Sequence, residues 1–400
     1  MSGERVFLSD VAWIEARVVD PTKPEYKDLP HVSAEHIGPI SGELQGLRTA
    51  SEDGMASAKY LFSAGDVLYS KLRPYLRKAT LPDFSGLCSA DIYPLKADPR
   101  RLLSAYLRWV LVSDEFAAYA RDLSARSRMP KLNREQLFAY EFELPDVQRQ
   151  EAVCLVVDAC LLKVKAAVQA GSRQLEDSLS LRAAIYRDAF QGVAPITVPP
   201  VFGEPPSGWR WRKLGDLARL ESGHTPSRSR PDWWGGEVSW LSLTEIRALD
   251  GRWVERTELR TNAAGIANSA ARILPRGTVC FSRTASVGFV AIMAQPMATS
   301  QDFANWVCGD ELDSEFLMHA LIRCRKELRE LATGATHKTI YMPTLESFHV
   351  CVPPLPEQQR IVAALKQQLA EVASLRAALD VQRKELAALP QRILAQAFNP

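Results

Sequence analysis

The sequence predicts an α+β protein in which one plan, a mixed domain followed by a long helix, occurs twice. Two long segments carry apolar residues at heptad spacing, which is typical of coiled-coil helices. Both segments open on the same Leu-Pro-x-x-Gln-Arg pattern, at residues 144–149 and 355–360. Short motifs of the first mixed segment also recur in order about 212 residues later.

These observations divide the chain into five segments. We expect two mixed domains separated by two long antiparallel coiled-coil helices, with an internal pseudo-two-fold duplication. Between the first helix and the second mixed domain, prolines crowd into one short stretch that cannot continue a helix. The expected segments are a mixed domain at 1–143, a long helix at 144–192, a Pro-rich linker at 193–208, a second mixed domain at 209–354 and a second long helix at 355–400.

The second long helix has the clearest heptad register. One seam is formed by Leu365, Val372, Leu379, Leu386 and Ile393. A companion seam is expected three residues further on, at Gln368, Leu375, Gln382, Leu389 and Gln396. A seam that is half glutamine buries little apolar surface, so we expect this helix to need one specific partner.

The first long helix is the expected partner. Its apolar spacing is supplied by Val157, Leu161, Val164, Val168 and Leu175. It ends on an Ala-Phe pair at residue 190, as the second helix does at residue 398. The intervening mixed domain is long enough for the chain to return, so the two helices can pair antiparallel.

The two mixed domains share motifs in one order. The segment 65–71 matches 277–283, and Ser89 and Asp91 match Ser300 and Asp302, at offsets of 212 and 211. A Met-Pro pair at 129–130 matches another at 342–343, at an offset of 213. In the first domain, apolar residues at helical spacing predict a single helix over 102–119.

Composition excludes several classes of protein. The 49 basic and 47 acidic residues nearly balance, so any nucleic-acid surface must come from local patches. Seven scattered cysteines without a Cys-x-x-Cys pair indicate reduced thiols rather than a zinc site or a disulfide framework. The N-terminus lacks the apolar run of a signal peptide, and no stretch is apolar enough to span a membrane. We therefore expect a soluble, cytoplasmic protein.

Local basic groups in both mixed domains suggest contact with DNA. Lysine and arginine neutralise phosphates, and arginine can bind base edges with two hydrogen bonds. Any single cation can equally be solvated surface. The candidate residues in the first domain are Tyr69, Lys71, Arg73, Arg77, Lys78, Arg126, Arg128 and Lys131. Those in the second domain are His224, Thr225, Ser227, Arg228, Arg230, Arg283, Thr284, His337 and Lys338.

Motifs for catalysis are absent from the sequence. It contains no Gly-x-x-x-x-Gly-Lys phosphate loop, no Gly-x-Gly-x-x-Gly loop, no His-Glu-x-x-His and no Asn/Asp-Pro-Pro-Tyr. Pro231, Asp232 and Glu237 partly match a nuclease metal site, but the Glu-x-Lys element is missing. We expect no catalysis by this chain alone and no metal bound to it.

The chain resembles the specificity subunit of type I restriction and modification systems. The resemblance is carried by the Leu-Pro segments at 144–149 and 355–363, by Ser-Gly-His-Thr-Pro-Ser at 222–227 and by Trp-Trp-Gly-Gly-Glu-Val-Ser-Trp-Leu at 233–241. It implies two target recognition domains, each reading one half of a bipartite, asymmetric site in double-stranded DNA. It also implies assembly with two copies of an AdoMet-dependent adenine methyltransferase subunit and with an ATP-driven restriction and translocase subunit. AdoMet, ATP and Mg would then serve those partners, and this chain would need no cofactor.

Alternatives remain at this stage. A coiled-coil scaffold that binds proteins rather than DNA, and a stand-alone nuclease or methyltransferase, predict different behaviour of the purified chain. The bases that are read and the spacing of the half-sites do not follow from composition. The expected docking surface for the methyltransferase comprises Gln148, Arg149, Gln359, Arg360 and Ile361, on faces of the helices outside the seams.

Overall fold

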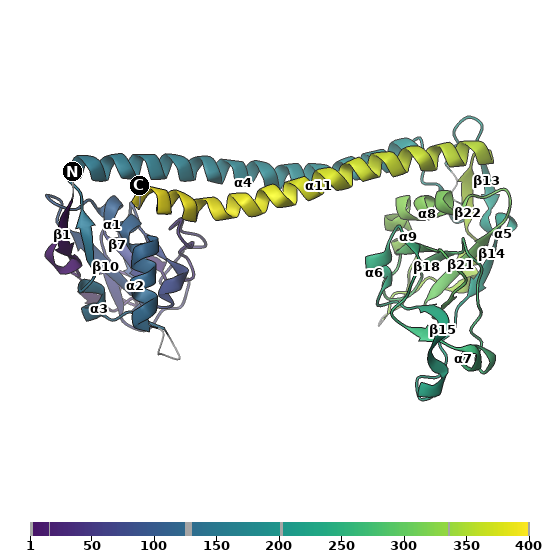
Figure 1. Cartoon of the computed structure of the whole chain (residues 1–400), viewed down its shortest axis with the longest axis horizontal. Helices are drawn as coiled ribbons and strands as arrows, with labels where there is room; N and C mark the ends of the chain where they lie inside the picture. Colours follow the sequence, from purple (N-terminus) through teal and green to yellow (C-terminus); the bar gives the residue numbers. More distant parts are fainter. Residues whose placement is uncertain (1–2, 16, 125–129, 201–202, 335–336, 399–400) are drawn as a thin grey trace. The chain divides into compact units, whose positions relative to one another are not determined.

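The computed structural model describes residues 3–15, 17–124, 130–200, 203–334 and 337–398 (Figure 1). The chain forms two compact units, which we call unit 1 and unit 2. Unit 1 comprises Met1–Gln174 with Leu379–Pro400, and unit 2 comprises Leu175–Ala378. The division falls within both long helices, so each unit contains one mixed domain and a part of each helix.

Two long helices, α4 (Val147–Ala189) and α11 (Leu355–Phe398), each pass through both units. Within unit 2, Tyr186 near the end of α4 shares a core with Leu365 near the start of α11. Within unit 1, Val157 near the start of α4 shares a core with Leu394 near the end of α11. The helices therefore run antiparallel, as their sequence pattern predicts.

The principal seam of α11 is confirmed, but four of the five members of the expected companion seam are exposed and only Leu389 is half-buried. Leu365 and Val372 are buried, and the later members of the principal seam are partly buried. Gln368, Gln382 and Gln396 are exposed, and Leu375 is 46% exposed. In unit 2 the second inward position lies four residues after the seam, at Leu369 and Arg376, because a helix turns once in about 3.6 residues.

The mixed domain of unit 1 is built on a four-stranded sheet, a five-stranded sheet and a two-stranded pairing, in the orders β2-β10-β7-β8, β3-β6-β9-β4-β5 and β1-β11. Every residue of the central strand β7 is buried. The strands are β1 (Glu4–Phe7), β2 (Ala12–Trp13), β3 (Arg17–Val19), β4 (Pro30–Val32), β5 (Arg48–Thr49), β6 (Lys59–Phe62), β7 (Val67–Ser70), β8 (Ala79–Thr80), β9 (Gly86–Cys88), β10 (Ile92–Ala97) and β11 (Glu141–Leu144).

The helices of this domain are α1 (Ser104–Leu111), α2 (Asp114–Ser124) and α3 (Arg134–Phe138). The single helix predicted over 102–119 is therefore two helices. Ser113 explains the break, because its hydroxyl accepts a hydrogen bond from the backbone N–H of Phe116 and caps the second helix. Asp114 and Glu115 in the first turn of α2 also suit the positive end of the helix dipole.

The mixed domain of unit 2 also has three sheets, in the orders β14-β21-β18-β19-β16, β17-β15-β20 and β12-β22-β13. Its strands are β12 (Ile196–Thr197), β13 (Arg210–Lys213), β14 (Ala218–Ser222), β15 (Trp234–Leu241), β16 (Trp253–Val254), β17 (Arg260–Thr261), β18 (Val279–Ser282), β19 (Val290–Met293), β20 (Ala298–Thr299), β21 (Phe303–Cys308) and β22 (His349–Val352). Its helices are α5 (Leu214–Leu217), α6 (Ile246–Leu249), α7 (Ala263–Ala267), α8 (Ser314–Arg323), α9 (Arg325–Glu330) and α10 (Met342–Glu346).

The two mixed domains repeat one plan. The strand order β2-β10-β7-β8 of unit 1 recurs as β14-β21-β18-β19 in unit 2. The central strands β7 and β18 are both buried at every residue, and β10 and β21 share the pattern of four buried residues followed by two half-buried ones. In each domain a helix follows the sheet, as α1 and α8, and a last strand leads into the long helix, as β11 and β22.

A buried glutamine anchors each long helix to its domain in the same way. In unit 1 the amide group of Gln150 donates to the carbonyl oxygens of Arg101 (2.7 Å) and Pro145 (2.8 Å). Its own oxygen accepts the backbone N–H of Leu103 at 2.9 Å. Each contact therefore ties the first turn of α4 to the segment that precedes it or to the segment that leads into α1.

In unit 2, Gln358 makes the same three contacts. Its amide group donates to the carbonyl oxygens of Glu311 and Pro353, both at 3.0 Å, and its oxygen accepts the backbone N–H of Asp313 at 2.9 Å. Three hydrogen bonds of one pattern, in two places, support the internal duplication more strongly than any short sequence match.

This equivalence corrects the register expected between the helix openings. Gln150 corresponds to Gln358, an offset of 208, whereas the matched Leu-Pro patterns imply an offset of 211. The Met-Pro match is wrong for the same reason, because α3 and α10 also correspond at an offset of 208. Met129 itself lies outside the described residues.

Candidate nucleic-acid interface

Each mixed domain presents a turn at the end of its central strand. In unit 2 the backbone of Arg283 donates to Asp302 (2.8 Å) and accepts from Ile340 (2.9 Å). In unit 1 the backbone of Lys71 makes the same two bonds, to Asp91 and from Leu132, both at 3.0 Å. Two flanking segments therefore hold a cationic residue at the same backbone position in both domains.

Both turns continue into a residue with left-handed backbone, Arg73 (φ 48°) in unit 1 and Ala285 (φ 55°) in unit 2. This conformation costs a residue with a side chain roughly 1–2 kcal/mol. The backbone N–H of Arg73 donates to Pro130 at 2.8 Å, and that of Ala285 donates to Lys338 at 2.9 Å. Non-glycine residues in this region are frequent at functional sites, so the paired turns are candidate contact points.

Two candidates in unit 1 are not available for contact. Tyr69 is fully buried against the ring of Phe116. Arg77 is 8% exposed, forms an ion pair with Asp114 at 2.6 Å and donates to the carbonyl of Val112 at 2.8 Å. The sequence pattern could not reveal their burial, because Tyr69 lies on β7, which is buried at every residue, and Arg77 is covered through its contacts with Asp114 and Val112.

The other candidates in unit 1 differ in whether their side chains are already bonded within the domain. Lys71 is half-buried and donates to the carbonyl of Ala90 at 2.6 Å, and Lys78 donates to that of Ala34 at 2.6 Å. Arg73 and Lys131 are exposed, and neither side chain forms a hydrogen bond or ion pair with the residues that the structure describes. Arg126 and Arg128 lie outside those residues.

In unit 2, the loop 222–234 is held against the domain by its glycine and by two tryptophans. A Cβ at Gly223 would overlap the backbone of Thr299, so only glycine fits there. The indole of Trp240 donates to the carbonyl of His224 at 3.1 Å, and that of Trp234 donates to the carbonyl of Ser227 at 3.2 Å. Both tryptophans therefore support the loop from within, and neither indole N–H is available to a ligand.

The arginines of this loop have different surroundings. Arg230 donates two hydrogen bonds to the carboxylate of Asp232, at 3.0 and 2.7 Å, and these bonds lower the pKa of Asp232. Arg228 has no acidic partner among the described residues and lies 5.5 Å from the centre of the Trp234 ring. It borders a cavity of about 370 Å³ that Arg260 also lines. Arg228 is therefore the loop's available cation.

The remaining loop candidates are partly engaged. The hydroxyl of Thr225 donates to the side chain of Gln301 at 2.6 Å, and the hydroxyls of Ser227 and Ser229 lie 2.8 Å apart. His224 and Ser227 are exposed.

Of the candidates near the turn after β18, some are bonded within the domain and others are exposed. The guanidinium of Arg283 donates to the carbonyls of Gln301 (2.9 Å) and Ile340 (3.4 Å), so it braces the turn. Thr284 contacts the hydroxyl of Thr339 at 3.4 Å. His337 and Lys338 are exposed.

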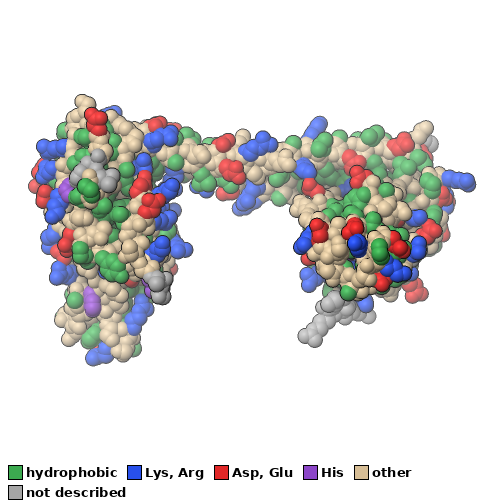
Figure 2. Space-filling view, turned by 180° about the vertical axis from the view of Figure 1, so that it is seen from behind, with side chains coloured by type: hydrophobic (Ala, Val, Ile, Leu, Met, Phe, Trp, Pro, Cys, Tyr) green, Lys and Arg blue, Asp and Glu red, His purple; other side chains and the backbone are tan. Residues whose placement is uncertain are grey.

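The sequence patterns missed a second group of cations beside this turn. The guanidiniums of Arg247, Arg325 and Arg329 all lie within 5.6 Å of the centre of the Phe289 ring. The i, i+4 spacing of Arg325 and Arg329 on one helix was the available signal. Figure 2 shows that basic and acidic side chains are interspersed on both mixed domains, so such local groups stand out only at the level of residues.

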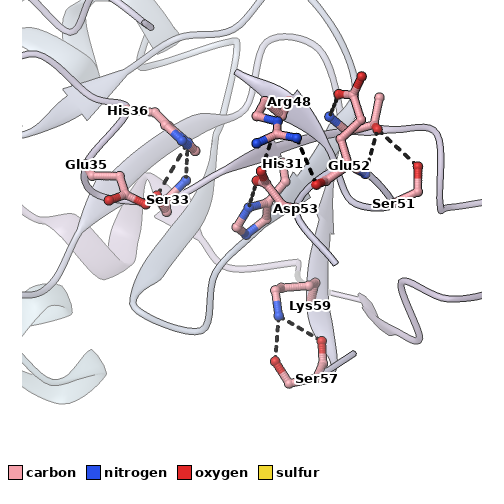
Figure 3. A network of polar contacts seen from close by, with 11 residues as sticks. His31, Ser33, Glu35, His36, Arg48, Ser51, Glu52, Asp53, Ser57 and Lys59 are labelled. Atoms are coloured by element: carbon pink, nitrogen blue, oxygen red, sulfur yellow. Dashed lines mark hydrogen bonds and ion pairs between the residues drawn. The ribbon is translucent and has the colours of Figure 1, made fainter. Parts of the chain in front are cut away.

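Unit 1 also contains a polar network that the sequence did not indicate (Figure 3). The carboxylate of Asp53 lies 3.4 Å from the Nδ1 of His31 and 3.5 Å from the guanidinium of Arg48. His31 is 3% exposed, and burial lowers its pKa. The buried ammonium of Lys59 donates to the carbonyl and hydroxyl of Ser57, at 2.8 and 2.6 Å.

Of the five expected docking residues, four lie at the surface. Gln148, Arg149, Gln359 and Arg360 are exposed, and Arg360 donates two hydrogen bonds to Glu357. Ile361 is 6% exposed and belongs to the core of unit 2, so it cannot form part of an exposed face.

The residues that the structure describes contain no group of three or more histidine, cysteine, aspartate or glutamate side chains placed to hold a metal ion. Among the same residues, no helix combines the length and the apolar character that crossing a bilayer requires.

Comparison with known proteins shows which proteins the chain resembles. Residues 206–379 match the family model described as "Type I restriction modification DNA specificity domain". The chain is 32% identical over 187 residues to the type I restriction enzyme EcoDI specificity subunit of Escherichia coli. That match covers 46% of this chain and 40% of the relative.

Two solved structures share the fold over nearly the whole chain. A structure titled for complex assembly and conformational transition of the type I R-M system matches with a TM-score of 0.76 at 22% identity, over 99% of this chain and 97% of that one. The HsdS subunit from Thermoanaerobacter tengcongensis matches with a TM-score of 0.68 at 22% identity, over 99% and 96%. These comparisons confirm the predicted resemblance to type I restriction-modification specificity subunits, and the matched family model places a DNA specificity domain at residues 206–379.

Proposed function

We propose that this chain reads a bipartite, asymmetric site in double-stranded DNA, with one half-site for each unit. The observation that carries the proposal is the duplicated turn at the end of the central strand. Its backbone bonds are the same in both units, but it presents Lys71 and Arg73 in unit 1 and Arg283, Thr284 and Ala285 in unit 2. A common frame suits a common mode of docking, and different side chains suit different bases.

The long helices would set the gap between the half-sites. Each is continuous through both units, and α4 with its 43 residues is about 65 Å long at roughly 1.5 Å per residue. Equivalent faces of duplex DNA recur every ~34–36 Å, so helices of this length suit half-sites about one or two turns apart. The buried glutamines, Gln150 and Gln358, would keep each reader in a fixed orientation on its helix.

Catalysis would reside in partner subunits. We propose that the chain directs two copies of an adenine methyltransferase subunit and an ATP-dependent restriction and translocase subunit to the site, in the cytoplasm. AdoMet, ATP and Mg would be bound by those partners and not by this chain. The exposed residues Gln148, Arg149, Gln359 and Arg360 at the openings of the helices are the proposed docking points for the methyltransferase.

Selection of duplexes from a random pool tests the proposal. The full chain, alone and together with its methyltransferase partner, is expected to enrich two fixed blocks of bases separated by a constant gap of any sequence. Binding should weaken steeply with added salt, because each neutralised phosphate releases counterions. A protein-binding scaffold would instead enrich no sequence and show no salt-dependent binding to duplexes, and that outcome would reject the proposal.

A further inference from the structure

We propose that unit 2 contains a binding site for one backbone phosphate of the DNA, formed by Arg247, Arg329 and Lys338 beside the turn that follows β18. The inference rests on the proposed function and deepens it. It adds Arg247 and Arg329, which no sequence motif singled out, and it assigns the cavity beside the turn to positioning the DNA.

The site is a cavity of about 380 Å³ with a strongly cationic lining. Three of its lining residues are Arg247, Arg329 and Lys338, and a fourth, Ser286, offers a hydroxyl. Among the residues that the structure describes, no aspartate or glutamate lines it. The three cations are exposed, so an anion that is part of a longer chain can approach from solvent.

Positive charge is concentrated here without equal compensation. The guanidiniums of Arg247, Arg325 and Arg329 lie 5.6, 5.2 and 5.5 Å from the centre of the Phe289 ring. Only Arg325 has a carboxylate partner, Asp250, which it contacts at 2.7 Å through both oxygens.

Arg247 and Arg329 form no ion pair with any residue that the structure describes. Burial, together with the neighbouring charges of Arg325 and Arg247, lowers the pKa of Arg329. Like charges held this close repel one another, and a bound anion would relieve the repulsion.

Contacts with the turn hold these guanidiniums in place and leave donors free. The Nε of Arg329 donates to the carbonyl of Val287 at 2.9 Å, and one Nη of Arg247 donates to the hydroxyl of Ser286 at 3.3 Å. A guanidinium has five N–H donors, so each arginine keeps several for a ligand. A planar fork of donors fits two oxygens of a phosphate.

The position of the cavity favours a DNA phosphate over other anions. Ala285 lines it, and the backbone N–H of Ala285 donates to Lys338, so the site and the candidate contact turn are one structure. A stacked base would need an aromatic face, but arginines surround Phe289, the one aromatic residue among the described residues of the lining. In unit 1, Arg77 near the equivalent turn is buried and paired with Asp114, so its guanidinium is not available to a phosphate there.

The test measures binding of the full chain to two unrelated mixed-sequence duplexes across a range of salt concentrations. Replacing both arginines, Arg247→Ala with Arg329→Ala, should weaken binding on the order of tenfold to both duplexes, since a charge-assisted hydrogen bond is lost. The slope of log affinity against log salt should become shallower by about one for each lost phosphate contact. The double lysine variant, Arg247→Lys with Arg329→Lys, keeps the charge and should keep most of the slope.

Two controls separate loss of the site from loss of the fold. Arg276→Ala removes an exposed arginine that stacks on Trp253, just before the start of β18 rather than after its end, and should leave the slope unchanged. If the double alanine variant fails to fold, Lys338→Ala decides, because its exposed side chain makes no hydrogen bond with the described residues. A shallower slope for Lys338→Ala then supports the site, and an unchanged slope rejects it.

The outcomes distinguish this inference from the proposed function. If the unaltered chain binds no duplex, both are wrong. If it binds duplexes and the folded double alanine variant binds them with the same affinity and slope, only the phosphate site is wrong. If inorganic phosphate raises the melting temperature of the unaltered chain but not of the variant, while duplex affinity is equal, the cavity takes free phosphate and the assignment to DNA is rejected.

Discussion

Replacing Gln358 with leucine should loosen unit 2 and leave unit 1 intact. Gln358 is fully buried at the first turn of α11, and it makes three hydrogen bonds to backbone groups, at 2.9, 3.0 and 3.0 Å. Leucine is similar in size but leaves one N–H and two carbonyls without their partner. At about 0.5–1.5 kcal/mol for each net hydrogen bond, Gln358→Leu should cost about 2–4 kcal/mol.

Amide hydrogen exchange is the suitable assay because it reports each unit separately. The expected cost corresponds to an increase in exchange rate of roughly 30- to 1000-fold at the amides protected by the affected contacts, around Asp313 and the opening of α11. Gln150 makes the equivalent three contacts in unit 1, so Gln150→Leu should give the same effect there and spare unit 2. Gln359→Leu, at an exposed neighbouring position, should change stability by less than about 0.5 kcal/mol.

Two results would refute this reasoning. An effect of Gln358→Leu no larger than that of Gln359→Leu would mean that the three bonds do not anchor the helix. Equal loosening of both units by either glutamine variant would mean that the units do not have separate anchors.

Three further predictions concern individual residues. Tyr69→Phe should leave duplex affinity unchanged and stability equal or slightly higher, because the buried hydroxyl has no partner among the described residues; a loss of affinity in a binding titration would contradict its placement. Gly223→Ala should cost about 1–3 kcal/mol in the unfolding free energy and impair binding, because its Cβ would overlap Thr299 and Ser300, whereas Gly215→Ala, where a Cβ has open space, should not. Burial lowers the pKa of His319 to about 4, below its usual 6.5. The stability that the buried neutral imidazole contributes to the fold should therefore be complete above pH 6.5 and be lost as the pH falls towards 4. Urea unfolding at pH 7 and pH 4 checks this. Between these pH values the unaltered chain should lose about 3 kcal/mol more unfolding free energy than His319→Gln, and equal losses would reject the assignment.

The duplicated architecture could be predicted because it leaves periodic marks in the sequence. The seam from Leu365 to Ile393 repeats every seven residues, and the motif at 65–71 recurs at 277–283. The register of the helix openings could not be predicted. Residues 352–356 read Val-Pro-Pro-Leu-Pro, which allows two alignments with the single Leu-Pro at 144–145, and only the hydrogen bonds of Gln150 and Gln358 select one.

The candidate site was harder to predict than the fold. A cation in a loop has the same sequence signature whether it braces the chain, as Arg283 does, or remains free, as Arg228 does. The group around Phe289 was missed because its arginines come from α6 and α9, about 80 residues apart, and only the tertiary structure brings them together. Burial of Tyr69 follows from the packing of β7, and burial of Arg77 follows from its contact with Asp114 of α2; a basic and aromatic pattern reveals neither.

The most direct test of the central claim is a map of methylated adenines in genomes of cells that express this chain with its methyltransferase partner. The unaltered chain should direct methylation to one bipartite site. Arg228→Ala should relax or change only one half of that site, because Arg228 belongs to unit 2, and the other half and the gap should stay the same. A change in both halves at once, or a methylated site with no gap between two blocks, would contradict one reader in each unit.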